Sequence, residues 1–227
     1  MARTFISASS QTLSVASLPA SAVPLTLAAW VKASSVALAF DAITLRDAGS
    51  QEVFRLRVNA SAAVLAQTAA AGAFASGTAT GAVSAGTWTH VAAVFASATS
   101  RIAYRDGGNA GSDATNKVPG TMATTEICGA ATTGNTIQIA LPAIWSAALS
   151  AGEVAALAAG LDPRLLQSKR AALVAFWPLA LGLSPEPDWV SAARNLTVTG
   201  ATRSDDPPNL INRAARRGMP GREINPT

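Results

Sequence analysis

The chain has 227 residues, of which 49% are hydrophobic, 13% are charged and 5% are aromatic. This length suits one large β domain or two small domains, and the apolar fraction excludes bulk disorder. The net charge of +4 does not by itself indicate nucleic acid binding. Alanine contributes 52 residues, so few large side chains are left to fill a core. No run of about 18 strongly apolar residues occurs, so we expect no membrane span. The N-terminal residues 1–5 lack the apolar core of a signal peptide, so we expect none.

The single cysteine and the single histidine exclude several kinds of site. Cys128 has no partner for an internal disulfide, and we expect it to be a small buried strand residue. His90 leaves no His/Cys cluster for zinc and argues against a His-dependent catalytic triad. We therefore favour a strand position for His90, with its ring bonded to a backbone or hydroxyl group, over a role as a general base. We expect no cofactor and no metal site.

Strand-like segments recur along the chain, with turn signals between them. Residues 52–59 alternate most cleanly, with Arg55 and Arg57 between apolar residues, which predicts a strand with one buried face. After residues 101–105, Asp106-Gly107-Gly108 predicts a tight hairpin turn, because Asp-Gly supplies positive φ angles. The alanine-rich residues 60–85 are expected to form weak strands and loops. The other expected strands are residues 4–6, 11–18, 25–32, 36–45, 87–96, 126–129, 136–141, 172–179 and 195–199.

One helix is predicted after Ser150. Ser150 and Glu153 have the spacing of a capping box, and Val154, Leu157 and Leu161 then share one face. Gly160 is expected to stop this helix. Many short strands with one short helix are typical of an antiparallel β-sandwich.

Residues 203–227, here called the C-terminal arm, differ in composition from the rest of the chain. They hold four of the twelve prolines and five of the seventeen basic residues, with very few large apolar residues. Alone in water, such a segment buries too little surface to offset its ordering entropy. We therefore expect one domain over residues 1–202 and an extended arm that docks on a neighbouring molecule.

Four motifs in order carry a family resemblance: Leu25–Lys32 with Trp30, Gly86–Ala92, Tyr104–Gly108 and Ile144–Ser150 with the following helix. This set resembles the laminin-G-like, concanavalin-A-like jelly-roll superfamily. The later stretches 160–163, 173–179 and 195–201 resemble a variant of that fold found in bacteriophage particle proteins. The resemblance implies an all-β, two-sheet antiparallel jelly roll over residues 4–202, followed by a proline-rich tail.

The fold hosts lectins, glycanases, adhesion modules and virion proteins, so individual residues must decide the function. Glycanases of this fold carry two or more carboxylates on one strand, and no such run exists in this chain. We therefore expect that the chain is not an enzyme. Four tryptophans, Trp30, Trp88, Trp145 and Trp177, are expected in the core. Trp189 lies in a loop context, where we expect a covering role and keep a glycan contact as the alternative.

The arginines of the C-terminal arm are the strongest charge feature, and they are Arg203, Arg213, Arg216, Arg217 and Arg222. We favour a docking arm that pairs with carboxylates of a neighbouring subunit. A solvated tail comes second. Nucleic acid comes last, because no aromatic residues are interleaved and Asp205, Asp206 and Glu223 dilute the charge.

The leading hypothesis is a non-enzymatic structural protein of a phage particle, assembled in the host cytoplasm and located in the virion. A capsid decoration, or cement, role is the first choice. The expected partners are the major capsid protein or other virion subunits, with further copies of the chain in a homo-oligomer. The alternative is a carbohydrate-binding module of a phage head or tail fibre.

Overall fold

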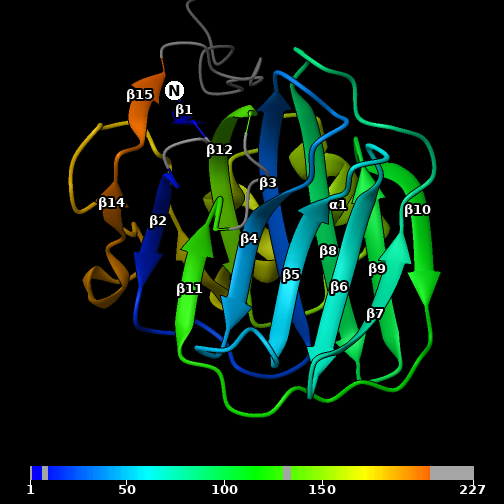
Figure 1. The fold of residues 1–227 in the computed structure, drawn as a ribbon. Coiled ribbons are helices and arrows are strands. Elements are labelled where there is room, and N and C mark those ends of the chain that lie inside the picture. The colour runs from blue at the N-terminus through cyan, green and yellow to red at the C-terminus, as the bar shows by residue number, and fades with distance from the viewer. Residues whose placement is uncertain (1, 7–9, 130–133, 205–227) are drawn as a thin grey trace, which may run out of the picture.

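Alternating side chains build a two-layered antiparallel sandwich. In β5 (Val53–Val58), Phe54, Leu56 and Val58 point into the core, while Arg55 and Arg57 lie on the outer face. The computed structural model describes residues 2–6, 10–129 and 134–204, and Figure 1 shows their two layers of strands. The predicted all-β jelly-roll class is confirmed.

The eight-stranded sheet, here called sheet A, has the order β10-β9-β8-β3-β12-β1-β15, with β13 paired to β12. Its strands are β1 (Ala2–Ile6), β3 (Leu25–Ala33), β8 (Thr89–Ser97), β9 (Ser100–Arg105), β10 (Gly108–Asp113), β12 (Thr136–Trp145), β13 (Leu173–Phe176) and β15 (Thr202–Ser204).

The seven-stranded sheet, here called sheet B, has the order β14-β2-β11-β4-β5-β6-β7. Besides β5, it contains β2 (Thr12–Val15), β4 (Phe40–Arg46), β6 (Val64–Ala70), β7 (Ala73–Thr78), β11 (Thr124–Ile127) and β14 (Thr197–Thr199). The alanine-rich region therefore forms β6 and β7, as predicted.

Some strand boundaries differ from the sequence-based expectation. The strand predicted over residues 36–45 begins only at Phe40, and those predicted over 11–18 and 172–179 shrink to β2 and β13. The strand predicted over 136–141 instead continues to Trp145, past a register shift between Ala140 and Ala143. That irregularity includes Leu141 at φ 51°, and such a bulge bends a strand without ending it.

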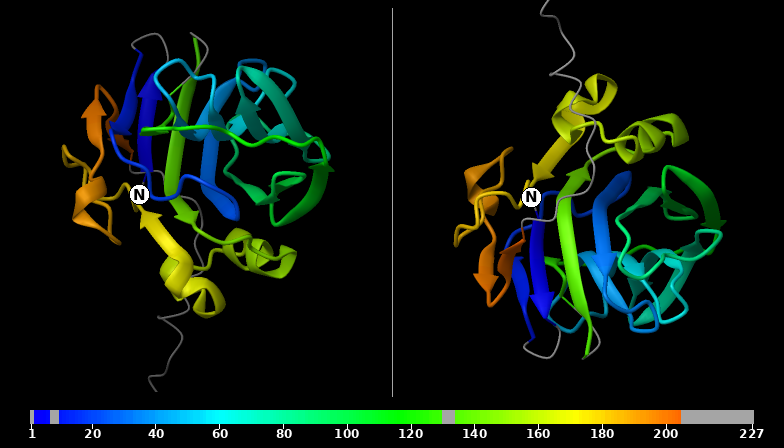
Figure 2. Two further views of the ribbon diagram at one scale, coloured as in Figure 1. Left: turned by 90° about the horizontal axis from the view of Figure 1, so that it is seen from below. Right: turned by 90° about the horizontal axis from the view of Figure 1, so that it is seen from above.

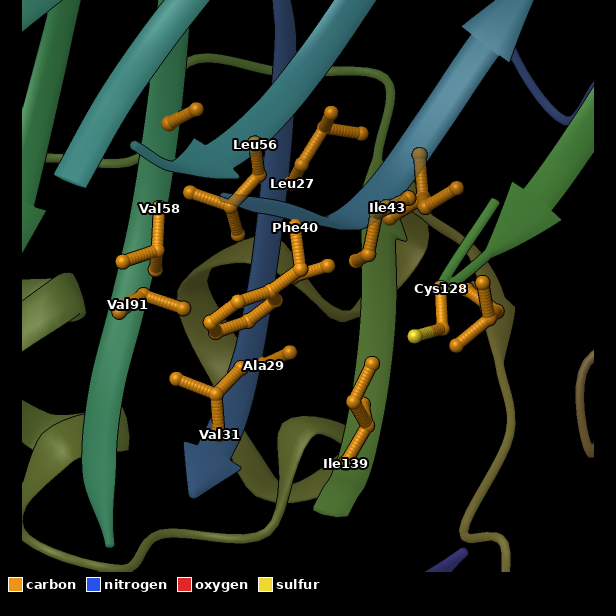
Figure 3. Close-up of a cluster of buried hydrophobic side chains, with 14 of the residues drawn as sticks. Leu27, Ala29, Val31, Phe40, Ile43, Leu56, Val58, Val91, Cys128 and Ile139 are labelled. Carbon is orange, nitrogen blue, oxygen red and sulfur yellow. The ribbon is translucent and has the colours of Figure 1, made fainter. Parts of the chain in front are cut away.

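The main core lies between the two sheets. Figure 3 shows Leu27, Ala29 and Val31 of sheet A facing Phe40 and Leu56 of sheet B. Cys128 is buried at the edge of this cluster, as expected, and burial raises the pKa of its thiol. Alanines between the larger side chains let the two layers approach closely.

A second core covers part of the outer face of sheet A. Helix α1 (Ala151–Ala158) and the 3-10 turns η2 (Pro163–Leu165) and η3 (Gln167–Ala172) lie on that side (Figure 2). A third such turn, η4 (Ala192–Arg194), precedes β14. The predicted capping box is confirmed: the Glu153 backbone N–H donates to Ser150, and the Ser150 backbone N–H donates to the Glu153 carboxylate. Val154 and Leu157 then pack on Trp145 and Phe176.

Of the four tryptophans predicted to lie in the core, two do so. Trp145 and Trp177 are fully buried, as expected. Trp30 and Trp88 are only half-buried. Because Leu27, Ala29 and Val31 take the inward positions of β3, the alternation turns Trp30 to the outer face.

Two glycines let the sheets close at the edge formed by β7 and β10. A Cβ atom added to Gly111 would lie 1.7 Å from the Thr78 carbonyl oxygen, and one added to Gly77 would lie 2.7 Å from the Arg101 carbonyl oxygen. The backbone N–H of Thr80 also donates to the Asn109 carbonyl at 2.8 Å. The two sheets therefore make backbone contact here, at the right of Figure 1.

Candidate functional site

A buried arginine organises the region where the described chain ends. The Arg3 guanidinium on β1 donates to Glu186 Oε2 at 2.7 and 3.2 Å, to the Ala201 carbonyl at 3.0 Å and to the Leu183 carbonyl. Arg3 and Glu186 are 3% and 1% exposed. This clamp fastens residues 183–201 against the first strand.

The last described strand gives the C-terminal arm a fixed base. β15 pairs antiparallel with β1, with Arg203 opposite Arg3, and the Gln138 side chain donates to Ser204 Oγ at 2.7 Å. The sandwich therefore includes Arg203 and Ser204, two residues beyond the boundary expected from sequence. The other predicted arm contacts, Arg213, Arg216, Arg217 and Arg222, lie outside the described residues.

Trp189, the candidate glycan contact, covers a neighbouring aromatic ring. It lies in a loop, as expected, and is 44% exposed. Its ring meets Phe176 edge to face at 6.2 Å, and the Arg164 guanidinium lies 4.5 Å from its centroid. Arg164 is itself held by both carboxylate oxygens of Asp162. One face of Trp189 is thus occupied by a cation, which leaves less aromatic surface for a sugar.

A buried carboxylate fixes the loop that carries Trp189. Asp188 Oδ1 accepts from the backbone N–H groups of Phe176 and Val190 at 3.0 and 2.9 Å, and Oδ2 accepts from Arg194 at 3.2 Å. The Arg194 carbonyl accepts from the indole of Trp177 at 2.9 Å. This loop is therefore part of the rigid body.

Every acidic side chain in the described residues has a structural partner. Three of the thirteen acidic residues lie outside the described part, which leaves ten. Asp41, Asp113, Glu126, Asp162, Glu186 and Asp188 pair with arginines, whereas Asp47, Glu52, Asp106 and Glu153 accept backbone N–H bonds. Glycoside hydrolysis needs two carboxylates aimed at one bond, and these ten are held by their own protein.

His90 is enclosed on the outer face of sheet A. It is 2% exposed and meets Trp30 edge to face at 5.4 Å. It lines a recess with Ala28, Trp30, Leu141, Trp145, Leu157, Leu161 and Pro163. The hydrogen bond predicted for the His90 ring does not form at Nδ1, which has no partner among the described residues. Burial lowers the pKa of His90 to about 3, so the ring is neutral near pH 7.

We expect this neutral His90 to make the protein less stable in acid. Its folded pKa lies below the unfolded value of 6.5, so below pH 6.5 the unfolded chain binds a proton that the folded chain does not. The free energy of unfolding should therefore fall by up to about 1.4 kcal/mol per pH unit from pH 6.5 toward pH 3. Urea unfolding of the wild type and His90→Phe at pH 7 and pH 5 measures the difference. An equal pH dependence in the two proteins would contradict the buried neutral ring.

Two groups of candidate site residues could not be identified from the sequence. Arg3 and Glu186 are 183 positions apart, and no local pattern links them. The polar residues on the outer face of sheet B come from strands that become neighbours only through the topology. The sole sequence signal for them is the pair of arginines in β5, which mark an outer face.

The part of the chain that the structure describes has neither a metal-binding cluster nor a membrane-spanning helix. No group of three or more His, Cys, Asp and Glu side chains there is arranged to hold a metal ion. None of the described helices has both the length and the apolar character needed to cross a membrane.

Comparisons with known proteins identify the family and the fold of this chain. A family model described as "Concanavalin A-like lectin/glucanases superfamily" matches residues 7–155. A heptameric SAP-like pentraxin from Limulus polyphemus is similar with a TM-score of 0.55 and 12% identity, over 84% of this chain and 89% of that chain. The receptor binding domain of botulinum neurotoxin type G gives 0.50 and 10%, over 69% of this chain and 46% of that chain. This chain thus spans less than half the length of that domain. No curated protein matches the sequence.

Proposed function

We propose that this chain, which belongs to the concanavalin A-like lectin/glucanases superfamily, is a non-enzymatic structural protein of a bacteriophage particle. The observation that carries the non-enzymatic part is the engagement of all ten described carboxylates. With a neutral, enclosed His90, the described body offers no free acid–base pair, which hydrolysis requires.

The phage assignment is supported by the later sequence motifs. Residues 160–163, 173–179 and 195–201 resemble those of phage particle proteins, and they form one connected unit. β13 pairs with β12, and the backbone N–H of Phe176 in β13 donates to Asp188, which ties this segment to sheet A. The unit leads directly into β15 and the base of the C-terminal arm.

Within the particle, we assign a capsid decoration role to the chain. The sandwich is a rigid head, and the arginine-rich arm docks on the major capsid protein or on a neighbouring copy. Guanidinium groups bond carboxylates in a bidentate manner. A modest contact repeated over many copies gives strong total attachment across subunit boundaries.

Deletion of the arm tests this assignment. Because Arg203 and Ser204 belong to β15, the deletion should remove only residues 205–227. We expect the truncated chain to fold and to be lost from purified particles, as measured by its copy number relative to the major capsid protein. Arg105→Gln, which changes a guanidinium on the body, is the matched control and should keep full occupancy. Unchanged occupancy of the truncated chain would overturn the docking role.

A further inference from the structure

Exposed apolar side chains gather around the point where the C-terminal arm leaves the sandwich. Eight large apolar side chains are exposed in the described residues, and five of them lie in two short segments after α1. These five are here called the exit patch, and they are Leu165, Leu181, Leu183, Trp189 and Val190. Monomeric soluble proteins rarely expose large contiguous apolar patches, so a cluster of this kind marks a docking surface.

Two leucines of the exit patch flank β15, the base of the arm. The Leu183 carbonyl accepts from Arg3, which is opposite Arg203 in the pairing of β1 with β15. Between the two leucines, a Cβ atom added to Gly182 would lie 3.3 Å from Arg203 Cδ. Leu181 and Leu183 therefore lie beside the last described strand.

The chain leaves β15 in the direction of β13. Arg203 is opposite Arg3, and Arg3 is opposite Ile139 of β12. β13 lies on the same edge of β12 as β1, because β3 occupies the other edge, and its Phe176 is opposite Ala143. β15 runs parallel to β12, since both are antiparallel to β1. It therefore points toward Phe176, which is four strand residues, or about 13 Å, ahead of Arg203.

Trp189 lies on the edge of β13 that faces away from β12, as β15 does on β1. Its backbone N–H donates to the Phe176 carbonyl at 2.8 Å, and the two rings meet edge to face. The Arg164 guanidinium, 4.5 Å from the centroid of the Trp189 ring, brings the neighbouring Leu165 to the same place. An extended chain spans about 3.3 Å per residue, so residues 205–211 cover up to about 23 Å and reach past Trp189.

The first part of the arm has a composition that suits this surface. Residues 205–211 contain Leu210 and Ile211, two prolines, two aspartates and no basic residue. The prolines favour an extended backbone, which lowers the entropy lost on docking. Four arginines all lie in residues 212–227. The ten described carboxylates are engaged within the body, so the body complements the apolar part of the arm rather than its arginines.

We propose that the exit patch binds residues 205–211 of its own chain, with Leu210 and Ile211 packed on Trp189. The covalent link keeps the local concentration of this segment high, so docking needs no second molecule. Residues 212–227, with their arginines, extend beyond the body. The inference rests on the arm of the proposed function and divides it into a body-bound base and a basic tip that is left for the neighbouring subunit.

Nuclear Overhauser spectroscopy of the purified full chain tests the proposal. We expect cross-peaks between the indole ring of Trp189 and the methyl groups of Leu210 or Ile211. A mixture of isotope-labelled and unlabelled chains, filtered for contacts between copies, should show none of them. Absence of the cross-peaks from the uniformly labelled chain would overturn the proposal. Cross-peaks confined to contacts between copies would also overturn it, because they would place the segment on a second copy.

Proteolysis of matched variants measures how firmly the segment is held. Chymotrypsin cleaves after Leu210, and cleavage requires the segment to leave the patch. We expect Trp189→Ala to accelerate this cleavage by about tenfold or more, and Leu165→Ser to accelerate it severalfold. Phe74→Ala is the control, because Phe74 is 46% exposed and contacts a guanidinium but lies on β7. Rates in both patch variants equal to that of Phe74→Ala would contradict the assignment.

Failure of this inference is distinguishable from failure of the arm's docking role. The spectroscopy and the proteolysis use the isolated chain, whereas the docking role is measured by occupancy in particles. If residues 205–211 do not contact Trp189 and the 205–227 deletion still empties the particle, this inference alone is wrong.

Discussion

Replacement of Arg3 by methionine is expected to lower the free energy of unfolding by about 3–5 kcal/mol. The substitution leaves the Glu186 carboxylate buried without its cation, because Glu186 is 1% exposed and Arg3 is its ion-pair partner. It also leaves the carbonyls of Ala201 and Leu183 without their donor. Urea unfolding at pH 7, followed by tryptophan fluorescence, measures the change.

Two further variants distinguish loss of the Arg3–Glu186 clamp from the effect of removing any arginine charge. In the double variant Arg3→Met/Glu186→Met no buried charge is left alone, so it should be more stable than Arg3→Met. Arg164→Met breaks the partly exposed Asp162 pair and should cost less than about 1 kcal/mol. A loss below 1 kcal/mol for Arg3→Met itself would show that the clamp does not hold β1 and the C-terminal segment together.

Replacement of Gly111 by alanine is expected to cost about 3 kcal/mol or more, at the upper end for overpacking. The added methyl group would lie 1.7 Å from the Thr78 carbonyl oxygen, so β7 and β10 must separate. Separation opens the edge where the two sheets meet. Thermal unfolding and amide hydrogen exchange of β7 and β10 report the loss of stability and its location.

Gly108 supplies a matched control in the same strand. A Cβ atom added there meets nothing within 4 Å, and Gly108 has no positive φ. Gly108→Ala should therefore change the free energy of unfolding by less than about 1 kcal/mol. Equal effects of the two substitutions would mean that backbone approach at Gly111 does not close the sandwich.

Local features of the fold could be predicted from the sequence. The hairpin turn at Asp106-Gly107 has the positive φ angles of 51° and 76° that Asp-Gly favours. The capping box at Ser150 and the alternation in β5 also formed as expected. Each of these depends on residues within a few positions of one another, so the sequence pattern contains the cause.

Features that depend on packing between distant segments could not be predicted. Whether Trp30 faces inward depends on which side of β3 meets sheet B, and both sides carry apolar residues. The polar side chains on the outer face of sheet B need six correct registers before they become neighbours. The partner of Arg3 lies in a segment whose sequence reads as a loop, so its pairing is visible only in three dimensions.

The candidate site residues also divide into those that local sequence indicates and those that depend on packing between distant segments. The sequence indicates a loop position for Trp189, but no local pattern links it to its partner Arg164 in η2. The arginines of the arm stand out by composition alone, and their docking role remains a prediction.

A cryo-electron microscopy map of the proposed phage particle tests the central claim most directly. We predict density for the sandwich on the outer surface of the capsid, with residues after Ser204 leaving β15 and contacting a neighbouring subunit. A particle without the sandwich, or a sandwich attached solely through its own sheets with no contact from the arm, would contradict the account.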